Sequence, residues 1–170
     1  MRPVLLTFAA AFFLPAPLTF AGPTVTFSRG TLILHTVRRV YKIRDVIDSR
    51  PFYTTVHAVH RRRDTYYVVF GNSEWSRGYP PRDGLCGSGI ESDIRWLAIR
   101  DGEIVDEQKG LHESCFKNRS SGPIAWKKHK LVWVATGPDP DREVDPTGVT
   151  FHWEFDPKHP EKGIVEKITR

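Results

Sequence analysis

Residues 149–155, Val-Thr-Phe-His-Trp-Glu-Phe, carry the clearest structural signal in this chain. Apolar and polar side chains alternate along the stretch, and alternate side chains of an extended strand point to opposite faces. The pattern therefore predicts a β-strand with one face in a core and the other in water. The predicted core face consists of Val149, Phe151, Trp153 and Phe155.

Two further stretches are apolar on both faces. Residues 65–70 read TYYVVF and residues 130–136 read KLVWVAT. Strands that are buried on both sides form near-continuous apolar runs, whereas half-buried strands alternate. We therefore expect both stretches to be central strands.

The rest of the chain has the composition of short strands separated by turns. β-Branched and aromatic residues recur in runs bounded by Gly, Pro, Asn and Asp, and no long helical period is present. We predict an all-β or mainly β fold, a single-domain antiparallel sandwich, barrel or meander of about eight strands with one disulfide. The other strands are expected at residues 31–37, 53–60, 93–100, 103–108 and 163–169, with 25–27 as a candidate ninth.

Turn residues mark how these strands connect. Residues 61–64 and the dipeptide Asp101-Gly102 are expected to close hairpins, since Asp-Gly favours the type I′ turn. Residues 37–47 fit both a helix and a strand, and strand is the preferred reading. Two long irregular loops are expected at 71–92 and 137–148.

Residues 1–21 have the layout of a secretory signal. Arg2 precedes an apolar run at 4–14, Pro15 and Pro17 end the run, and small residues precede a cleavage point near Ala21. A transmembrane anchor, the alternative, needs about 20 apolar residues and this run is shorter. We expect a secreted or periplasmic protein whose single β-rich domain spans 22–170.

The chain has two cysteines, Cys86 and Cys115. In an oxidising compartment two cysteines of one small domain tend to pair, and a disulfide across this separation stabilises a fold by roughly 3 kcal/mol. A redox pair would normally be a close C-x-x-C, and a zinc pair would need a second pair of ligands. A Cys86–Cys115 disulfide is the expectation.

The net charge of +5 is unevenly distributed. Residues 22–63 hold nine Lys or Arg and only Asp45 and Asp48 as acids. An exported protein rarely meets nucleic acid, so the predicted partners are an acidic protein, an anionic glycan or a membrane surface, and no nucleic acid. The alternative is a solvated face that serves only solubility.

Residues 74–93 form a predicted loop that is rich in aromatic and charged side chains, and this loop is the predicted binding site. Trp, Tyr and Arg dominate binding hot spots, and a disulfide at Cys86 would hold the loop in place. The alternative is that Trp75 and Tyr79 only cover the end of a β core. The candidate binding residues are Trp75, Arg77, Tyr79, Arg82, Asp83, Glu91 and Asp93.

No catalytic, cofactor or metal site is predicted. Cys86-Gly-Ser-Gly-Ile90 departs from the hydrolase pattern G-x-S-x-G at both outer positions. His57 and His60 resemble a metal-ligand pair, but residues three apart on a regular strand point to opposite faces. The other histidines are scattered.

Three functions remain open. The first is an exported binding protein, including an inhibitor or immunity-type protein that acts on an envelope or extracellular enzyme. The second is a structural envelope component or small-ligand carrier, which would contain a cavity. The third is a cell-wall or envelope hydrolase that uses Glu91 and Asp93 with a histidine such as His112 or His152.

Overall fold

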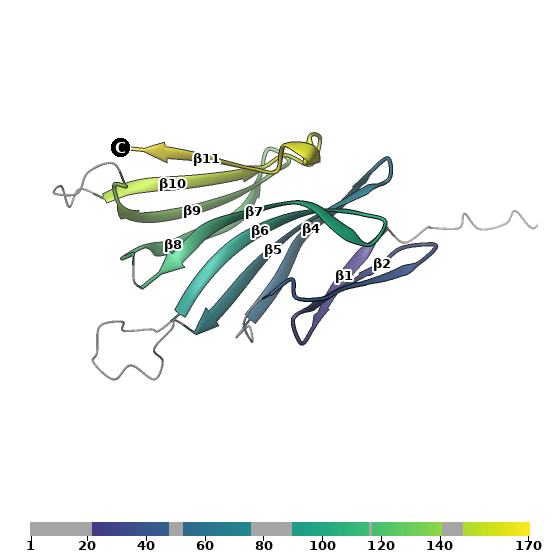
Figure 1. Cartoon of the computed structure of the whole chain (residues 1–170). Coiled ribbons are helices and arrows are strands. Elements are labelled where there is room, and N and C mark those ends of the chain that lie inside the picture. The colour runs from purple at the N-terminus through teal and green to yellow at the C-terminus, as the bar shows by residue number, and fades with distance from the viewer. Residues whose placement is uncertain (1–21, 48–52, 76–89, 116, 141–147) are drawn as a thin grey trace, which may run out of the picture.

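The computed structural model describes residues 22–47, 53–75, 90–115, 117–140 and 148–170. These residues form three antiparallel sheets with the strand orders β1-β2-β3, β4-β5-β6-β7 and β11-β10-β9-β8. Figure 1 shows the sheet of β4–β7 between the other two. The elements are β1 (Thr24–Ser28), β2 (Thr31–His35), β3 (Val40–Ile43), β4 (Tyr53–Arg62), β5 (Thr65–Trp75), β6 (Ile90–Arg100), β7 (Glu103–Ser114), β8 (Ser120–Lys127), β9 (Lys130–Pro138), β10 (Gly148–Phe155), the 3-10 turn η1 (Pro160–Lys162) and β11 (Ile164–Thr169).

The central sheet is buried on both faces because it lies between two cores. We call the sheet of β1–β3 the N-terminal sheet and the sheet of β8–β11 the C-terminal sheet. Along β5, Tyr67 and Val69 belong to the core shared with the C-terminal sheet, while Val68 and Phe70 belong to the core shared with the N-terminal sheet. The same division holds along β6, from Ile94 to Ile99. The prediction that residues 65–70 form a central strand is therefore confirmed.

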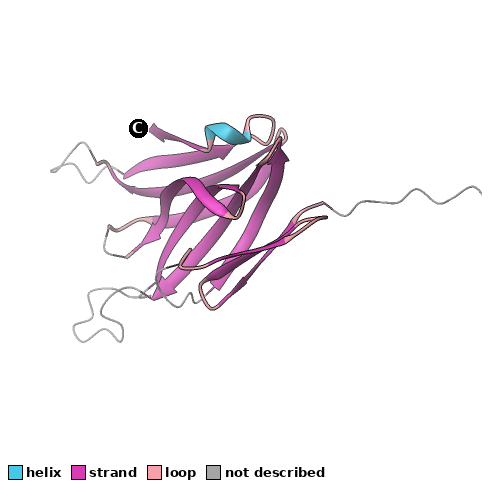
Figure 2. Ribbon diagram, turned by 45° about the vertical axis from the view of Figure 1, so that its right-hand side comes forward, coloured by secondary structure: helices cyan, strands magenta, loops and turns pink. Residues whose placement is uncertain are grey.

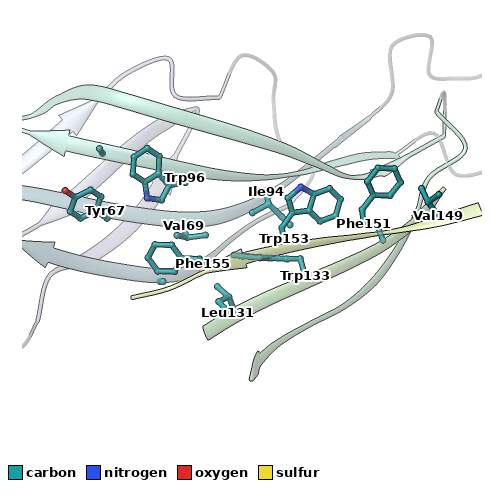
Figure 3. Packing of buried hydrophobic residues seen from close by; sticks show 13 residues of the cluster. Tyr67, Val69, Ile94, Trp96, Leu131, Trp133, Val149, Phe151, Trp153 and Phe155 are labelled. Carbon is teal, nitrogen blue, oxygen red and sulfur yellow. The ribbon is translucent and has the colours of Figure 1, made fainter. Parts of the chain in front are cut away.

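The stretch 149–155 forms β10 and supplies the largest side chains of the C-terminal core. Its four predicted core residues are all at most 3% exposed. Figure 3 shows Phe151 and Trp153 of β10 among the side chains between the sheets, with Trp133 of β9 nearby. Burying aromatic groups of this size is the main stabilising contribution of the layer.

Residues 130–136 form β9 but do not have two buried faces. Leu131, Trp133 and Ala135 are buried, whereas Val132 and Val134 are only partly buried. The sheet of β8–β11 covers the central sheet with one face, and no strand of the described residues forms a layer over its other face. The strand that is buried on both sides together with β5 is β6, not β9.

Several sequence predictions need correction. The described residues contain eleven strands rather than about eight, and the sheets are open and stacked, not closed into a barrel. Residues 71–75 and 90–92 continue β5 and β6, so the predicted irregular loop 71–92 is shorter than expected. Strand β8 was not predicted, because its sequence lacks apolar alternation. It is an edge strand with a bulge between Ser121 and Ile124.

The predicted turns agree with the structure. The β6–β7 hairpin has positive φ at both Asp101 and Gly102, as a type I′ turn requires. The β4–β5 hairpin turns at Arg63 and Asp64, and β3 occupies part of the ambiguous segment 37–47. Figure 2 shows that strands dominate the fold, with one short helical turn. None of the helical residues described is part of a helix long and apolar enough to span a membrane.

Candidate functional site

Two histidines leave the regular ladders of the central sheet. In the β4–β5 ladder Val56 pairs with Phe70 and Ala58 pairs with Val69, so His57 is an extra residue. In the β6–β7 ladder Ser92 pairs with Glu113 and Asp93 with Leu111, so His112 is the extra residue. Both are β-bulges, which redirect a side chain and are frequent next to functional sites.

The two bulges lie on the outer strands of the central sheet and direct both rings to the C-terminal sheet. The ring of His57 meets Trp133 edge to face with 5.9 Å between centroids. The ring of His112 meets Trp153 in the same way at 6.3 Å, and its Nε2 donates to the Val134 carbonyl at 3.1 Å. His112 is close enough to His57 to influence its pKa.

Between these histidines lies an open pocket of about 380 Å³. It extends from the central sheet to edge strand β8, near the end where β5 stops and β6 begins. Its volume is within the usual range of small-ligand sites, roughly 300–1,000 Å³. The lining residues are Tyr53, Thr55, His57, Gly71, Asn72, Ser73, Ser92, Asp93, Ile94, His112, Glu113, Ser121 and Ile124.

Gly71 makes room for the His57 ring. A Cβ atom at position 71 would lie 3.1 Å from Nε2 of His57, closer than side chains normally approach. The ring therefore lies against the main chain of β5. The hydroxyls of Ser73 and Ser92 are 2.9 Å apart, so they hydrogen-bond across β5 and β6 next to the ring.

Some polar atoms of this pocket have no hydrogen-bond partner among the described residues. The Thr55 hydroxyl is buried without one, and no hydrogen bond joins the His57 ring nitrogens to another described residue. Leaving a buried polar group unpaired costs about 1–3 kcal/mol. A ligand or ordered water that bonds to these atoms would recover that free energy.

Both pocket histidines are held neutral at physiological pH. Burial lowers the pKa of His57, and the neighbouring His112 lowers it further. Burial also lowers the pKa of His112, although the carbonyls of Val134 and Gly122 and the charge of Glu113 act in the opposite direction. A neutral imidazole has one donor and one acceptor nitrogen. The site is thus suited to hydrogen bonding rather than to holding a fixed charge.

Among the described residues, Asp93 is the one predicted binding residue that lines the pocket, but its carboxylate is already occupied. It is only 5% exposed and bonds to Arg95 at 3.0 Å and to Lys109 at 2.7 Å. Arg95 in turn donates to the carbonyl of Val46, which belongs to the N-terminal core. Asp93 therefore acts as a structural ion-pair partner.

The other predicted acid, Glu91, accepts a hydrogen bond from the main-chain N–H of Cys115. It does not line the pocket, so the pocket does not bring Glu91 and Asp93 together beside a histidine. His152 lies on β10 and is not a lining residue either. The arrangement that the hydrolase interpretation required is absent from the described pocket.

Most of the predicted loop lies outside the described residues. Trp75 ends β5 and pairs in register with Ile90, at the same end of the sheet as the pocket. Because Cys86 is outside the described residues, the Cys86–Cys115 disulfide stays a prediction. The same holds for the predicted binding residues Arg77, Tyr79, Arg82 and Asp83.

His57 and His60 lie on the same face of β4, so the prediction that they point to opposite faces was wrong. It assumed a regular strand, but the bulge at His57 shifts the alternation by one residue. Both rings therefore face the C-terminal sheet, with His60 near Phe155 at 5.9 Å and His57 near Trp133. Among the described residues, no group of three or more His, Cys, Asp and Glu side chains could hold a metal ion.

The low pKa values predict a loss of stability on mild acidification. Burial lowers the pKa of His57, His60 and His112 below 6.5 in the folded chain. Below pH 6.5 the unfolded chain then binds more protons than the folded chain, so the free energy of unfolding falls as pH falls. We expect the melting temperature to drop between about pH 7.5 and about pH 5.

The control for this pH dependence is another histidine. Replacing buried His112 and half-buried His57 and His60 with glutamine should reduce the drop in melting temperature, whereas replacing exposed His35 should leave it unchanged. The measurement is thermal unfolding followed by circular dichroism at each pH. An equal pH dependence in the wild-type and triple-variant proteins would contradict the assignment.

Sequence reasoning missed His57, Gly71 and Ser73 as site residues, and it named His112 only as a candidate histidine of the hydrolase interpretation. Neither bulge has a sequence signature, since no glycine or proline marks it, and the residues come from three different strands. The two histidines and Ser73 surround the pocket with neutral imidazole and hydroxyl groups that donate and accept hydrogen bonds. No protein-family model, curated protein or solved structure matches this chain, so its function is argued from that chemistry.

Proposed function

We propose that this chain is an exported binding protein that holds a small, uncharged, hydroxyl-bearing ligand such as a sugar between His57 and His112. The observation that carries the proposal is the pair of β-bulges that turn both neutral imidazoles into one pocket of about 380 Å³. Ligand sites of this kind combine apolar walls with a few convergent polar groups. Here Ile94 and Ile124 supply apolar surface.

The chemistry of the walls supports an uncharged ligand. At neutral pH the imidazoles carry no charge, and the hydroxyls of Thr55, Ser73 and Ser92 both donate and accept. The carboxylate of Glu113, another lining residue, accepts a hydrogen bond from Ser121 at 3.2 Å. Sugar hydroxyls can satisfy such a mixed set of donors and acceptors.

Binding is favoured over hydrolysis because both acids that line the pocket among the described residues, Glu113 and Asp93, are already engaged, Glu113 by the Ser121 hydroxyl. The carboxylate of Asp93 is neutralised by Arg95 and Lys109. A general base must reach the reacting proton within hydrogen-bond distance, directly or through one water. Export and the Cys86–Cys115 disulfide are part of the same proposal and are supported by residues 1–21 and by the cysteine count.

The test is a thermal-shift series with mono- and disaccharides as probes. A ligand that binds only the folded chain raises its stability by about 2.7 kcal/mol at one hundred times its dissociation constant. We expect at least one probe to raise the melting temperature of the wild-type protein. The shift should disappear in Gly71→Val, whose side chain would enter the space of the His57 ring.

Gly148→Ala is the matched control, since a Cβ there would meet no atom closer than 3.7 Å. His57→Leu adds a second readout because it keeps bulk and removes only the hydrogen-bonding nitrogens. If probes stabilise Gly71→Val and wild-type protein equally, the pocket is not the binding site. If no probe in the series shifts the wild-type protein, the sugar assignment is wrong.

Inhibition of an exported enzyme is the second candidate function. It is favoured by Tyr53, which is 63% exposed and lines the pocket, and by the predicted binding residue Trp75, which ends β5 at the same end of the sheet. Exposed aromatic side chains are frequent hot spots in protein interfaces. Inhibition of a lysozyme that is lost in Tyr53→Ala, without any sugar-induced shift, would favour this candidate.

A further inference from the structure

A second concave site lies at the opposite end of the central sheet, where three hairpins meet. The turns between β2 and β3, β4 and β5, and β6 and β7 enclose a groove of about 490 Å³. Its main lining residues are Arg38, Arg39, Tyr41, Arg61 and Tyr66. None of these lines the histidine pocket, so the two sites can be tested separately.

Three guanidinium groups of this groove have no carboxylate partner among the described residues. These groups belong to Arg38, Arg39 and Arg61, and none of the ion pairs of the described residues involves them. Two acids line the groove among the described residues. Asp64 lies 3.4 Å from Arg100, which leaves Asp101 to offset the positive charge of the three arginines. The groove therefore has a surplus of positive charge and unused guanidinium donors.

The local structure fixes the groove before any ligand arrives. The Thr36 hydroxyl accepts hydrogen bonds from the N–H groups of Arg38 and Arg39 and donates to the Arg39 carbonyl at 2.8 Å. Gly102 has φ +89°, and a Cβ there would lie 2.7 Å from the Tyr41 ring. The ring therefore packs against the main chain of the β6–β7 turn. Preordered groups lose less entropy on binding.

Aromatic rings accompany the charges. The Arg61 guanidinium carbon lies 5.5 Å from the centre of the Tyr66 ring, and its Nε donates to the Arg63 carbonyl at 3.0 Å. The terminal nitrogens of Arg61 form no hydrogen bond with another described residue. Planar guanidinium groups bind sulfate or carboxylate through paired hydrogen bonds, while tyrosine faces offer apolar surface.

We propose that this groove binds an anionic oligosaccharide, with its sulfate or carboxylate groups on Arg38, Arg39 and Arg61 and a sugar ring against Tyr41. The volume is larger than a single anion requires and lies in the range of organic ligands. A membrane is the weaker fit, because exposed Val37 and Val40 provide little apolar area and even one acyl chain binds a bilayer only marginally.

Isothermal titration calorimetry of the full chain with a heparin hexasaccharide tests the proposal, and maltohexaose is the neutral probe. We expect the heparin probe to bind in the groove. Any binding of neutral maltohexaose belongs to the histidine pocket and should not change when the three groove arginines are replaced. The variant Arg38→Gln/Arg39→Gln/Arg61→Gln should weaken binding by about tenfold, the combined effect of three exposed charge pairs. All three side chains belong to exposed residues, so the fold should persist, as circular dichroism will verify.

The matched control is Lys117→Gln/Lys127→Gln/Lys167→Gln, which removes the same charge from exposed residues elsewhere. It should change the affinity by less than about twofold. An equal loss in both triple variants would show that only net charge matters and would overturn the site. Tyr41→Leu adds a test of the sugar ring, since an unchanged affinity would overturn the stacking contact.

Vesicles that contain phosphatidylglycerol separate a free sugar from a lipid headgroup. We expect vesicle binding to be weak and unaffected by Tyr41→Leu. The oligosaccharide proposal is wrong if the vesicles bind, the hexasaccharide does not bind, and the arginine variant no longer binds the vesicles. In that case the ligand is a lipid headgroup. Neither outcome bears on the histidine pocket, whose test uses uncharged sugars.

Discussion

Replacing Trp153 with alanine is expected to lower the free energy of unfolding by about 3–5 kcal/mol. The side chain is 1% exposed, stacks on Phe151 with 5.9 Å between ring centres, and donates from Nε1 to Glu166 at 2.7 Å. Gly110 of β7 lies close to it across the layer, since a Cβ there would lie 3.0 Å from the indole nitrogen. Because the two β layers already lie close together here, they cannot move in to fill the space of the indole. The substitution would therefore leave a cavity between them.

Urea denaturation of the purified protein measures this loss. Trp153→Phe should cost less, because the ring remains and only the hydrogen bond to Glu166 and part of the packing are removed. Thr150→Ala, on the other face of the same strand, is the matched control and should cost about 1 kcal/mol or less. A loss for Trp153→Ala no larger than that of the control would contradict the assignment of the core.

The second large effect is expected at Asp93. Asp93→Ala should lower the free energy of unfolding by about 3–5 kcal/mol, because it leaves the largely buried Arg95 guanidinium without its carboxylate. The side chains of Asp93 and Arg95 are 5% and 13% exposed, whereas that of Lys109, the other partner of Asp93, is 53% exposed. Arg95 therefore bears most of the cost.

The double variant Asp93→Ala/Arg95→Met distinguishes an unpaired charge from a simple loss of packing. Removing both charges should recover much of the stability that Asp93→Ala loses, since apolar replacement of a buried ion pair is often neutral. Glu103→Ala, an exposed acid on β7, should stay within about 0.5 kcal/mol of wild type. Additive losses in the double variant would show that the Asp93–Arg95 pair is not coupled.

Much of the β architecture was predictable because it follows from local patterns. The alternation in residues 149–155 identified the core face of β10, and the apolar run 65–70 identified a strand between two layers. The dipeptide Asp101-Gly102 identified its hairpin through the positive φ values that a type I′ turn needs. In each case the physical cause acts over a few neighbouring residues.

The strand count and the layer order were not predictable in the same way. Strand β8 is an exposed edge strand with Pro123 and a bulge, so it lacks the alternation of a half-buried strand. Residues 130–136 are apolar enough for a central strand, yet within the described part of the chain one face of β9 is buried and the other is only partly buried. Whether a second layer covers a strand depends on residues that are distant in the chain.

The candidate site shows the same division. The sequence by itself determined the β-strands, the hairpins and the basic surplus of the first third, because periodicity, turn chemistry and charge are local properties. Only the tertiary structure decided that His57 and His112 face one pocket and that Asp93 is an ion-pair partner of Arg95. A β-bulge depends on register against a neighbouring strand, and the burial that shifts a pKa depends on what packs above it.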